Sequence, residues 1–407
     1  DEPILKKHGL ENIPLFGMVK DGGHRTRAIA KSGGEIAFTS KRRAFTLVSE
    51  IQEEVHRFAV TYHRQKHKAS ALSSTLTDIP GIGPSRAKAL LRHFKTVTAN
   101  PLRETVNAGG WMAHTHGCDF VLALGGGSVM DGSKGICAVA ANPHTDAEGN
   151  ECPGDIWDFV NGGTALGLPI PNDPLPLVCV TTTAGTGSEV DAGGVLSCED
   201  NDEKLRLGDP RLFPVLSVVD PELMVSVPAR LTSYQGFDAL FHCVECYISN
   251  TNTPMGDMVC REGIRRAAAA LPTCVNNGDD LEARSSLAFA NTLGGYAMDA
   301  SGTTGSHGLE HGMSAHHHDL PHGAGLIMIA RAYHTWMIDH GAAPERYIDM
   351  ARLMGNAAAN DPHDFVVELT RLMEACHVAD LAMSEWGITV EELPAIAHNA
   401  LTTNGVL

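Results

Sequence analysis

The stretch Phe120–Asp131 reads FVLALGGGSVMD, and it decides the fold class. Its first five residues are an apolar run of strand length, and the glycines that follow lead into a helical pattern that reaches Ala140. A buried strand that passes through a glycine-rich turn into a helix is typical of a parallel α/β sheet. Glycines also let backbone N–H groups approach a phosphate, and the start of a helix favours its negative charge. The stretch therefore predicts a nucleotide-binding unit.

Two further apolar runs extend this pattern along the chain. Leu177–Val180 leads into the Thr- and Gly-rich segment Thr181–Ser188, and Ser217–Val219 precedes an Asp-Pro pair. Short buried strands separated by loops and helices predict a parallel sheet. After Pro228 the sequence becomes Ala-rich with helical spacing. We therefore expect an α/β half at residues 99–227 and an all-α half at residues 228–407.

Charge divides the chain unevenly, although the whole chain of 407 residues has a net charge of −17. Residues 1–98 hold 17 Lys and Arg against 9 Asp and Glu, and the remainder holds 14 against 39. A basic segment attracts polyanions, whereas a strongly acidic one repels nucleic acid. No run of about 18 apolar residues predicts a membrane span, and the first residues do not resemble a signal peptide. The ten cysteines lack the spacing of a disulfide framework, so we expect a cytoplasmic protein.

Histidine placement gives the sharpest chemical signal. Six of the 21 histidines fall between His307 and His322. Upstream, Asp238 and His242 are four residues apart, so they share one face of a helix. A carboxylate with several imidazoles suits a divalent first-row metal that keeps an open position. The alternative interpretation is a run of solvated surface histidines, which would be favoured for any one of them taken alone.

The same residues resemble the metal motifs of the iron-containing alcohol dehydrogenase family. Residues 236–245, GFDALFHCVE, resemble the first motif, and residues 307–325 resemble the second. The resemblance implies Fe²⁺, with Zn²⁺ as an alternative, bound by Asp238, His242, His307 and His322. It also implies that His311 lines the substrate pocket and relays a proton. The loop before His322 is about one residue longer than the family's usual form, which leaves His307 and His311 as alternatives for the third ligand.

The resemblance extends to the glycine-rich loop and to the segment after the second apolar run. It implies reversible hydride transfer between a small alcohol or aldehyde and NAD or NADP, by a chain that forms homo-oligomers, commonly dimers. The implied fold is an α/β dinucleotide-binding domain followed by an all-α metal domain, as in dehydroquinate synthase. The implied cofactor contacts are Gly125, Gly126, Gly127, Ser128, Asp131, Thr182, Thr183 and Lys204.

Residues 1–98 resemble a different family, the C-terminal part of the excision-repair nuclease subunit UvrC. The matching stretches are Gly17–Asp21, Glu54–Arg64 and Asp78–Phe94, and the last lies in a helix-hairpin-helix element at residues 76–94. This resemblance implies RNase H-like and helix-hairpin-helix pieces, which could contact DNA phosphates only through residues 1–98. The first βα unit of the dehydrogenase family is not found there, so we expect only a partial cofactor domain. The alternatives are a DNA-binding or repair protein and an inactive chimera joined near Val97–Asn100.

Overall fold

The computed structural model describes residues 17–20, 26–31, 34–35 and 94–403. The chain divides into two compact units, Asp1–Pro84 and Ser85–Leu407. The division falls inside the segment predicted as helix-hairpin-helix, and that segment lies outside the described residues except for Phe94. In the first unit, three strands form an antiparallel sheet in the order β1-β2-β3: β1 (Gly17–Lys20), β2 (Thr26–Lys31) and β3 (Gly34–Glu35).

A parallel sheet organises the first half of the second unit. It has the order β10-β7-β4, with β4 at Val121–Gly125, β7 at Leu177–Thr181 and β10 at Leu216–Val219. Val121 pairs with Leu177, and Leu216 pairs with Val178. Because each strand is almost wholly apolar, it can be buried between covering layers. All three strands lie where the apolar runs predicted them, to within one residue at either end.

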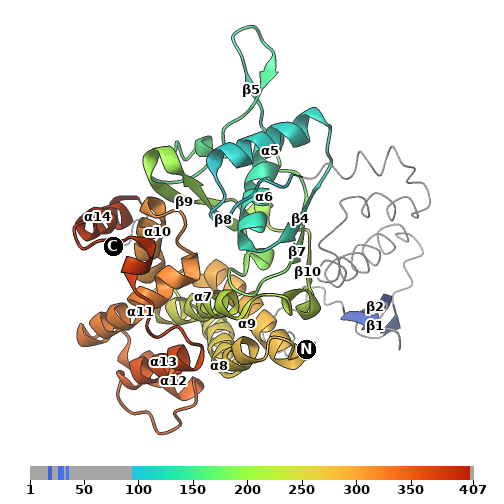
Figure 1. Cartoon of the computed structure of the whole chain (residues 1–407). Coiled ribbons are helices and arrows are strands. Elements are labelled where there is room, and N and C mark those ends of the chain that lie inside the picture. Colours follow the sequence, from blue (N-terminus) through green and yellow to red (C-terminus); the bar gives the residue numbers. More distant parts are fainter. Residues whose placement is uncertain (1–16, 21–25, 32–33, 36–93, 404–407) are drawn as a thin grey trace. The chain divides into compact units, whose positions relative to one another are not determined.

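Helices and a second pair of strands cover this sheet. The helix α6 (Gly127–Ala140) packs against β4 and β7, and α5 (Arg103–Thr115) packs on α6 (Figure 1). An antiparallel pair, β8 (Gly193–Cys198) and β9 (Glu203–Gly208), contacts α6 and continues toward the helical half. A small hairpin projects from this half, formed by β5 (His144–Thr145) and β6 (Glu151–Cys152).

The second half of this unit is helical. Thr253 caps α8 by accepting from Gly256 N at 3.1 Å, and Asp280 caps α9 by accepting from Ala283 N at 2.9 Å, as expected for N-cap residues. The helices are α7 (Ala229–Ile248), α8 (Pro254–Asn276), α9 (Leu281–Ser301), α10 (Gly305–His316), α11 (His322–Asp339), α12 (Pro344–Leu353), α13 (Asp364–Ala375) and α14 (Leu393–Thr403). Short 3-10 helices lie at Ile156–Asp158 (η2), Ser188–Val190 (η3), Glu199–Asn201 (η4), Pro210–Leu212 (η5), Pro221–Met224 (η6) and Met383–Trp386 (η7).

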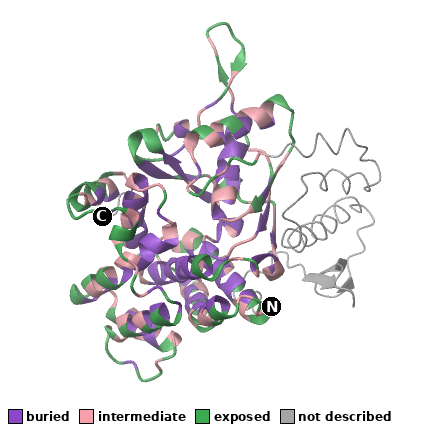
Figure 2. Cartoon of the chain, in the orientation of Figure 1, coloured by how far each residue is buried: buried purple, intermediate pink, exposed green. Residues whose placement is uncertain are grey.

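The helix α7 forms the centre of the helical core. Almost its whole length is buried, from Thr232 to Tyr247, and it packs against α8, α9 and α11 (Figure 2). Cys243 and Cys246 lie in this core with no exposed surface. None of the helices in the described ranges is both long and apolar enough to cross a membrane. The predicted class, an α/β half followed by an all-α half, is confirmed.

Candidate metal and cofactor site

The helix α7 presents the first two candidate ligands. Asp238 and His242 lie one turn apart on its buried face, and each side chain is 6% exposed. The distance from His242 Nε2 to Asp238 Oδ1 is 3.6 Å. This spacing follows from the i, i+4 geometry of a helix, which the sequence already indicated.

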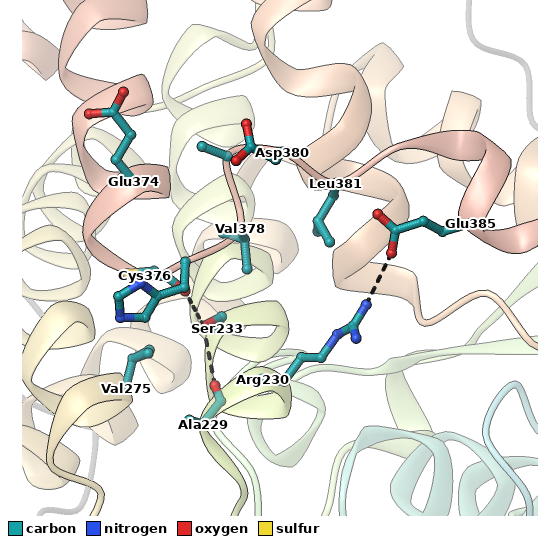
Figure 3. A pocket seen from close by; sticks show the side chains of 12 residues that line it. Ala229, Arg230, Ser233, Val275, Glu374, Cys376, Val378, Asp380, Leu381 and Glu385 are labelled. Carbon is teal, nitrogen blue, oxygen red and sulfur yellow. Dashed lines mark hydrogen bonds and ion pairs between the residues drawn. The ribbon is translucent and has the colours of Figure 1, made fainter.

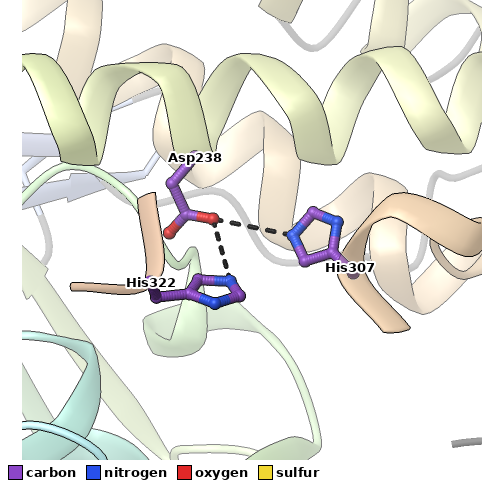
Figure 4. A group of neighbouring side chains, drawn as sticks. All are labelled: Asp238, His307 and His322. Atoms are coloured by element: carbon purple, nitrogen blue, oxygen red, sulfur yellow. Dashed lines mark ion pairs between the residues drawn. The ribbon is translucent and has the colours of Figure 1, made fainter. Parts of the chain in front are cut away.

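Two more histidines reach the same carboxylate oxygen from other helices. His307 lies in the first turn of α10, and its Nε2 is 3.6 Å from Asp238 Oδ1. His322 is the first residue of α11, and its Nε2 is 3.5 Å from that oxygen. Figure 4 shows both rings turned toward Asp238 from separate segments. The rings of His242 and His307 stack, with centroids 4.6 Å apart. The structure thus places all three proposed histidines next to Asp238. Asp238, His307 and His322 form one compact donor group, and His242 lies outside that group, with its Nε2 3.6 Å from Asp238 Oδ1.

The donor atoms of this cluster fit a metal ion. Two donors that each bind one tetrahedral metal at about 2.1 Å are about 3.4 Å apart, close to the 3.5–3.6 Å from Asp238 Oδ1 to the three Nε2 atoms. Within residues 94–403, Asp238 Oδ1 and His307 Nε2 are buried and have no hydrogen-bond partner. Buried polar atoms are rarely left unpaired, so the pair points to a bound ion. One carboxylate and three imidazoles match the preference of Fe²⁺ and Zn²⁺.

The other ring nitrogen of each histidine is held by an outer partner. His242 Nδ1 donates to Gly185 O at 3.1 Å, and His307 Nδ1 donates to Glu245 Oε1 at 2.6 Å. His322 Nδ1 donates to Glu310 Oε2. When the rings are neutral, a proton on each Nδ1 leaves the lone pair of each Nε2 free to bind a metal at the common centre. Outer partners of this kind orient metal-binding imidazoles and increase their basicity.

Sequence reasoning missed these outer carboxylates. Glu245 stands within the first metal motif, seven residues after Asp238 and so on the same face of α7. That spacing could have identified it. Glu310 precedes His311 in the sequence and gives no comparable periodic signal. Its role depends on the distance between α10 and α11, which only the tertiary structure shows.

Electrostatics in the cluster favour a bound cation. Burial raises the pKa of Asp238, but the surrounding His242, His322 and His307 outweigh it and hold that pKa well below its usual range. Burial also lowers the pKa of His242 to about 4, so its imidazole is neutral and able to bind a metal. Burial acts in the same direction on His307, yet Glu245 and Asp238 raise its pKa to about 10. A metal bound at this centre would therefore displace a proton from His307.

The geometry bears on the choice between His307 and His311. His311 does not belong to the group around Asp238; it groups with Glu310 and with the other side of His322. Its ring centroid lies 5.5 Å from that of His322. Burial, followed by the charge of Lys204, lowers the pKa of His311 well below its ordinary value. This arrangement supports His307 as the ligand and His311 as a neutral imidazole beside the centre.

The two predicted cofactor loops meet at the ends of adjacent strands. Thr182 N donates to Gly125 O at 3.0 Å. A Cβ added at Gly126 would lie 2.9 Å from Thr183 Cγ2, and one at Gly127 would lie 2.1 Å from Thr186 Cγ2. The start of α6 stands directly behind them, with Gly126 as its N-cap. A helix N-terminus framed by two close loops is suited to a pyrophosphate.

Two other predicted cofactor residues are engaged within the protein. Asp131 accepts from Ser188 Oγ at 2.5 Å and from Val195 N at 2.9 Å, which ties α6 to η3 and β8. Lys204 Nζ donates to Glu310 Oε2 at 3.1 Å and is 4% exposed, beside the metal cluster rather than beside the glycine-rich loop. Their roles as cofactor contacts stay predictions.

A surface hollow of about 720 Å³ lies elsewhere, between the start of α7 and the segment after α13. Figure 3 shows the ion pair of Arg230 with Glu385 and the hydrogen bond of Ser233 to the backbone of Cys376 in its wall. None of the metal-cluster residues lines it. We therefore assign the chemistry to the buried cluster.

Known proteins match this chain over most of its length. The 1,3-propanediol dehydrogenase of Klebsiella pneumoniae is 32% identical over 76% of this chain and 76% of its own length. The chain belongs to the iron-containing alcohol dehydrogenase family. The NAD-dependent methanol dehydrogenase of Bacillus methanolicus is 30% identical over 75% of the chain and 77% of its own length. A probable NADH-dependent butanol dehydrogenase of Bacillus subtilis is 33% identical, but the match spans only 62% of that relative, less than two thirds.

Family models and solved structures agree with this membership. Residues 43–221 match the model of the iron-containing alcohol dehydrogenases, and residues 232–407 match that of the family's C-terminal domain. An archaeal halo-thermophilic alcohol dehydrogenase from a Red Sea brine pool superposes with a TM-score of 0.71 at 30% identity, covering 76% of this chain and 77% of the other. Residues 2–60 match the UvrC RNase H endonuclease domain, which confirms the second resemblance over those residues, and the helix-hairpin-helix element at residues 76–94 stays a prediction. The two N-terminal matches overlap at residues 43–60.

Proposed function

We propose that this iron-containing alcohol dehydrogenase transfers hydride reversibly between a short alcohol and NAD, at an Fe²⁺ centre held by Asp238, His242, His307 and His322. The observation that carries this is the set of three Nε2 atoms at 3.5–3.6 Å from Asp238 Oδ1. The relatives' names, which refer to butanol, methanol and 1,3-propanediol, support a short alcohol as substrate. Zn²⁺ suits the same four ligands.

The metal, when bound, supplies a Lewis acid that polarises the alcohol oxygen and lowers its pKa. The chain's own residues do the rest. The outer partners Gly185 and Glu245 hold two imidazoles in one tautomer, with Nε2 toward the centre. His311 lies beside the centre with a lowered pKa, so it is neutral at physiological pH. An unprotonated nitrogen of its ring can accept the alcohol's proton.

The cofactor half of the proposal uses the paired loops. Backbone N–H groups at the start of α6 would receive the pyrophosphate, and Thr182 and Thr183 lie at the end of the neighbouring strand β7. The nicotinamide carries the hydride, while the protein orients it toward the substrate carbon. Relatives described as NAD- or NADH-dependent support NAD over NADP. A preference test compares KM for NADH and NADPH with the same aldehyde.

Metal content and activity together test the proposal. The purified full chain, loaded anaerobically with Fe²⁺ and then desalted, should retain about one ion per chain and oxidise short primary alcohols. His322→Ala should lose both the ion and the activity, because it removes one of four ligands. His340→Ala is the matched control, since His340 is exposed and lies outside the cluster. Retention of a stoichiometric ion by His322→Ala, with full activity, would refute the assignment.

Two finer expectations remain predictions. Family members commonly dimerise, and light scattering of the purified chain measures its oligomeric state directly. A cytoplasmic location is expected from the cysteines. All ten lie between Cys118 and Cys376 and are free thiols in the structure. Fractionation of the cells that produce the chain tests that location.

A further inference from the structure

The outer carboxylate on His322 differs from the one on His307. Glu310 lies in the middle of α10 with no exposed surface, and its Oε2 accepts from both His322 Nδ1 and Lys204 Nζ. Lys204, on β9, also donates to Ser314 Oγ at 2.8 Å. Glu245 instead accepts from neutral partners besides His307: Thr304 N and Oγ1, and Ser306 Oγ. Only the outer partner of His322 therefore carries its own fixed cation.

Lys204 also determines whether a second metal ion could bind beside His322. Glu310, His311 and His322 lie close enough together to form a metal-binding group. Lys204 Nζ already stands there, 3.1 Å from Glu310 Oε2 and 3.3 Å from His322 Nδ1. A second metal ion next to this ammonium would meet a like charge at short range. In this group the ammonium of Lys204 therefore stands in place of a metal ion. The metal site is the group that contains Asp238, on the other side of His322.

The charge of the whole cluster follows from four buried groups. Asp238, Glu245 and Glu310 each contribute one negative charge, and Lys204 contributes one positive charge, which sums to −2 when the imidazoles are neutral. Buried charge that is left uncompensated destabilises the folded state. A divalent cation brings the sum to zero.

The second carboxylate oxygen of Glu310 is unpaired. This Oε1 is buried and accepts no hydrogen bond from any residue in the described part of the unit. A glutamine at this position could still accept from His322 through its amide oxygen, but its N–H₂ group would replace one of the two buried oxygens. What a glutamine would not supply is the negative charge that pairs with the ammonium of Lys204.

From these contacts we propose that Glu310, fixed by Lys204, is a positioning residue of the metal centre. It holds His322 with Nε2 toward the ion, and with Lys204 it forms a neutral pair that leaves a charge of −2 for a divalent cation. The inference rests on the proposed metal site, and it adds residues that act through a ligand rather than on the substrate.

The test measures Zn²⁺ affinity of the metal-free full chain by competition with a chromophoric chelator. Glu310→Gln should bind Zn²⁺ about 10- to 100-fold more weakly, the usual effect of losing an outer partner. The double variant Glu310→Gln with Lys204→Met restores the sum of −2 and keeps the amide acceptor for His322, so it should recover most of that loss. A purely structural role would predict a double variant no better than the single one.

Glu203→Gln is the matched control. Glu203 precedes Lys204 on β9 and is buried, but its carboxylate faces away and accepts from Trp157 Nε1 at 3.1 Å and Thr164 N at 2.6 Å. Its variant should keep the wild-type Zn²⁺ affinity. The proposal is overturned if Glu310→Gln binds Zn²⁺ as tightly as the wild type, if Glu203→Gln loses as much, or if the double variant recovers nothing. If the wild type itself binds no Zn²⁺ or Fe²⁺, the proposed function fails first, and that result is distinct from the others.

A further single variant covers the case in which Glu310→Gln does not fold, as judged by circular dichroism. Lys204→Met changes the sum of the site to −3, so Zn²⁺ should bind at least as tightly as to the wild type. Weaker binding by this folded variant would overturn the charge argument.

Discussion

The substitution Gly127→Ala tests whether the two loops form one phosphate site. The added Cβ would lie 2.1 Å from Thr186 Cγ2, 2.5 Å from its Oγ1 and 2.8 Å from its Cβ. Rotation about χ1 of Thr186 moves its Cγ2 and Oγ1 but not its Cβ, so the Thr186 side chain cannot avoid the clash. The loop backbone must therefore shift. Overpacking of this kind costs about 1–3 kcal/mol.

Both affinity and stability should respond to this shift. A displaced loop weakens hydrogen bonds to a charged phosphate, which contribute about 1.5–3 kcal/mol each, so NADH affinity should fall about 10- to 100-fold. The melting temperature should fall by a few degrees. Fluorescence titration with NADH and a thermal scan measure the two effects. The double variant Gly127→Ala with Thr186→Gly removes the clashing atoms and should recover most of the NADH affinity.

Gly132→Ala is the control on the same helix. Its Cβ would approach Pro101 Cβ at 3.3 Å and Val97 Cγ1 at 3.5 Å, contacts that a small adjustment relieves. Alanine is favoured over glycine inside a helix by about 1 kcal/mol, so this variant should bind NADH normally and be no less stable. If Gly127→Ala binds NADH like the wild type, or if Gly132→Ala is equally damaging, the reasoning about the loops is wrong.

Three other predictions concern charge and metal. Burial raises the pKa of Asp155, but hydrogen bonds from Arg103 and Asn107 outweigh it and lower that pKa to about 2. Asp155→Asn should therefore lower the free energy of unfolding by about 2 kcal/mol at pH 7. This loss of stability should shrink between about pH 4 and pH 2, which urea unfolding across that range measures. A loss that stays constant over that range would contradict the prediction. Residues 99–407 hold 14 basic against 39 acidic side chains. Raising NaCl to about 1 M should screen the repulsion among the acidic side chains and increase the melting temperature. An unchanged melting temperature would mean that this repulsion is negligible. Removing the metal with a chelator should lower the melting temperature, and Zn²⁺ should restore it in the wild type but not in Asp238→Asn.

The sequence predicted the features that depend on local pattern. The strands β4, β7 and β10 are continuous apolar runs, so their positions could be predicted to within a residue. Asp238 and His242 share a helix face because of their spacing alone. The antiparallel pair β8 and β9 was not predicted, because β9 buries Glu203 and Lys204. Charged residues such as these do not look like strand residues in a sequence. They can be placed in a buried strand only once the residues that pair with them are known.

The remaining ligands and partners required tertiary information. His307 and His322 were proposed from a motif, but their convergence on one oxygen of Asp238 depends on how α10 and α11 pack on α7. Glu245 and His307 are 62 residues apart in the sequence and form a hydrogen bond of 2.6 Å. Asp131 fits a phosphate-loop pattern, yet its carboxylate binds Ser188 and Val195 within the protein. A side chain's partner cannot be deduced from its own neighbours in the chain when several folded contacts compete for it.

The strand β4 carries the clearest sign that the two halves of the site differ. Among the described strands of its sheet, β4 lies at one edge, and its Leu122 and Leu124 are 42% and 39% exposed while Ala123 between them is buried. Strands of parallel sheets are usually covered on both faces, and within residues 94–403 no layer covers the face of β4 that carries Leu122 and Leu124. The metal cluster has no such gap, because α7, α10 and α11 supply every candidate ligand and two outer carboxylates. Since the cofactor loop begins at the end of β4, we expect a disturbance of β4 to weaken NAD binding before it weakens metal binding.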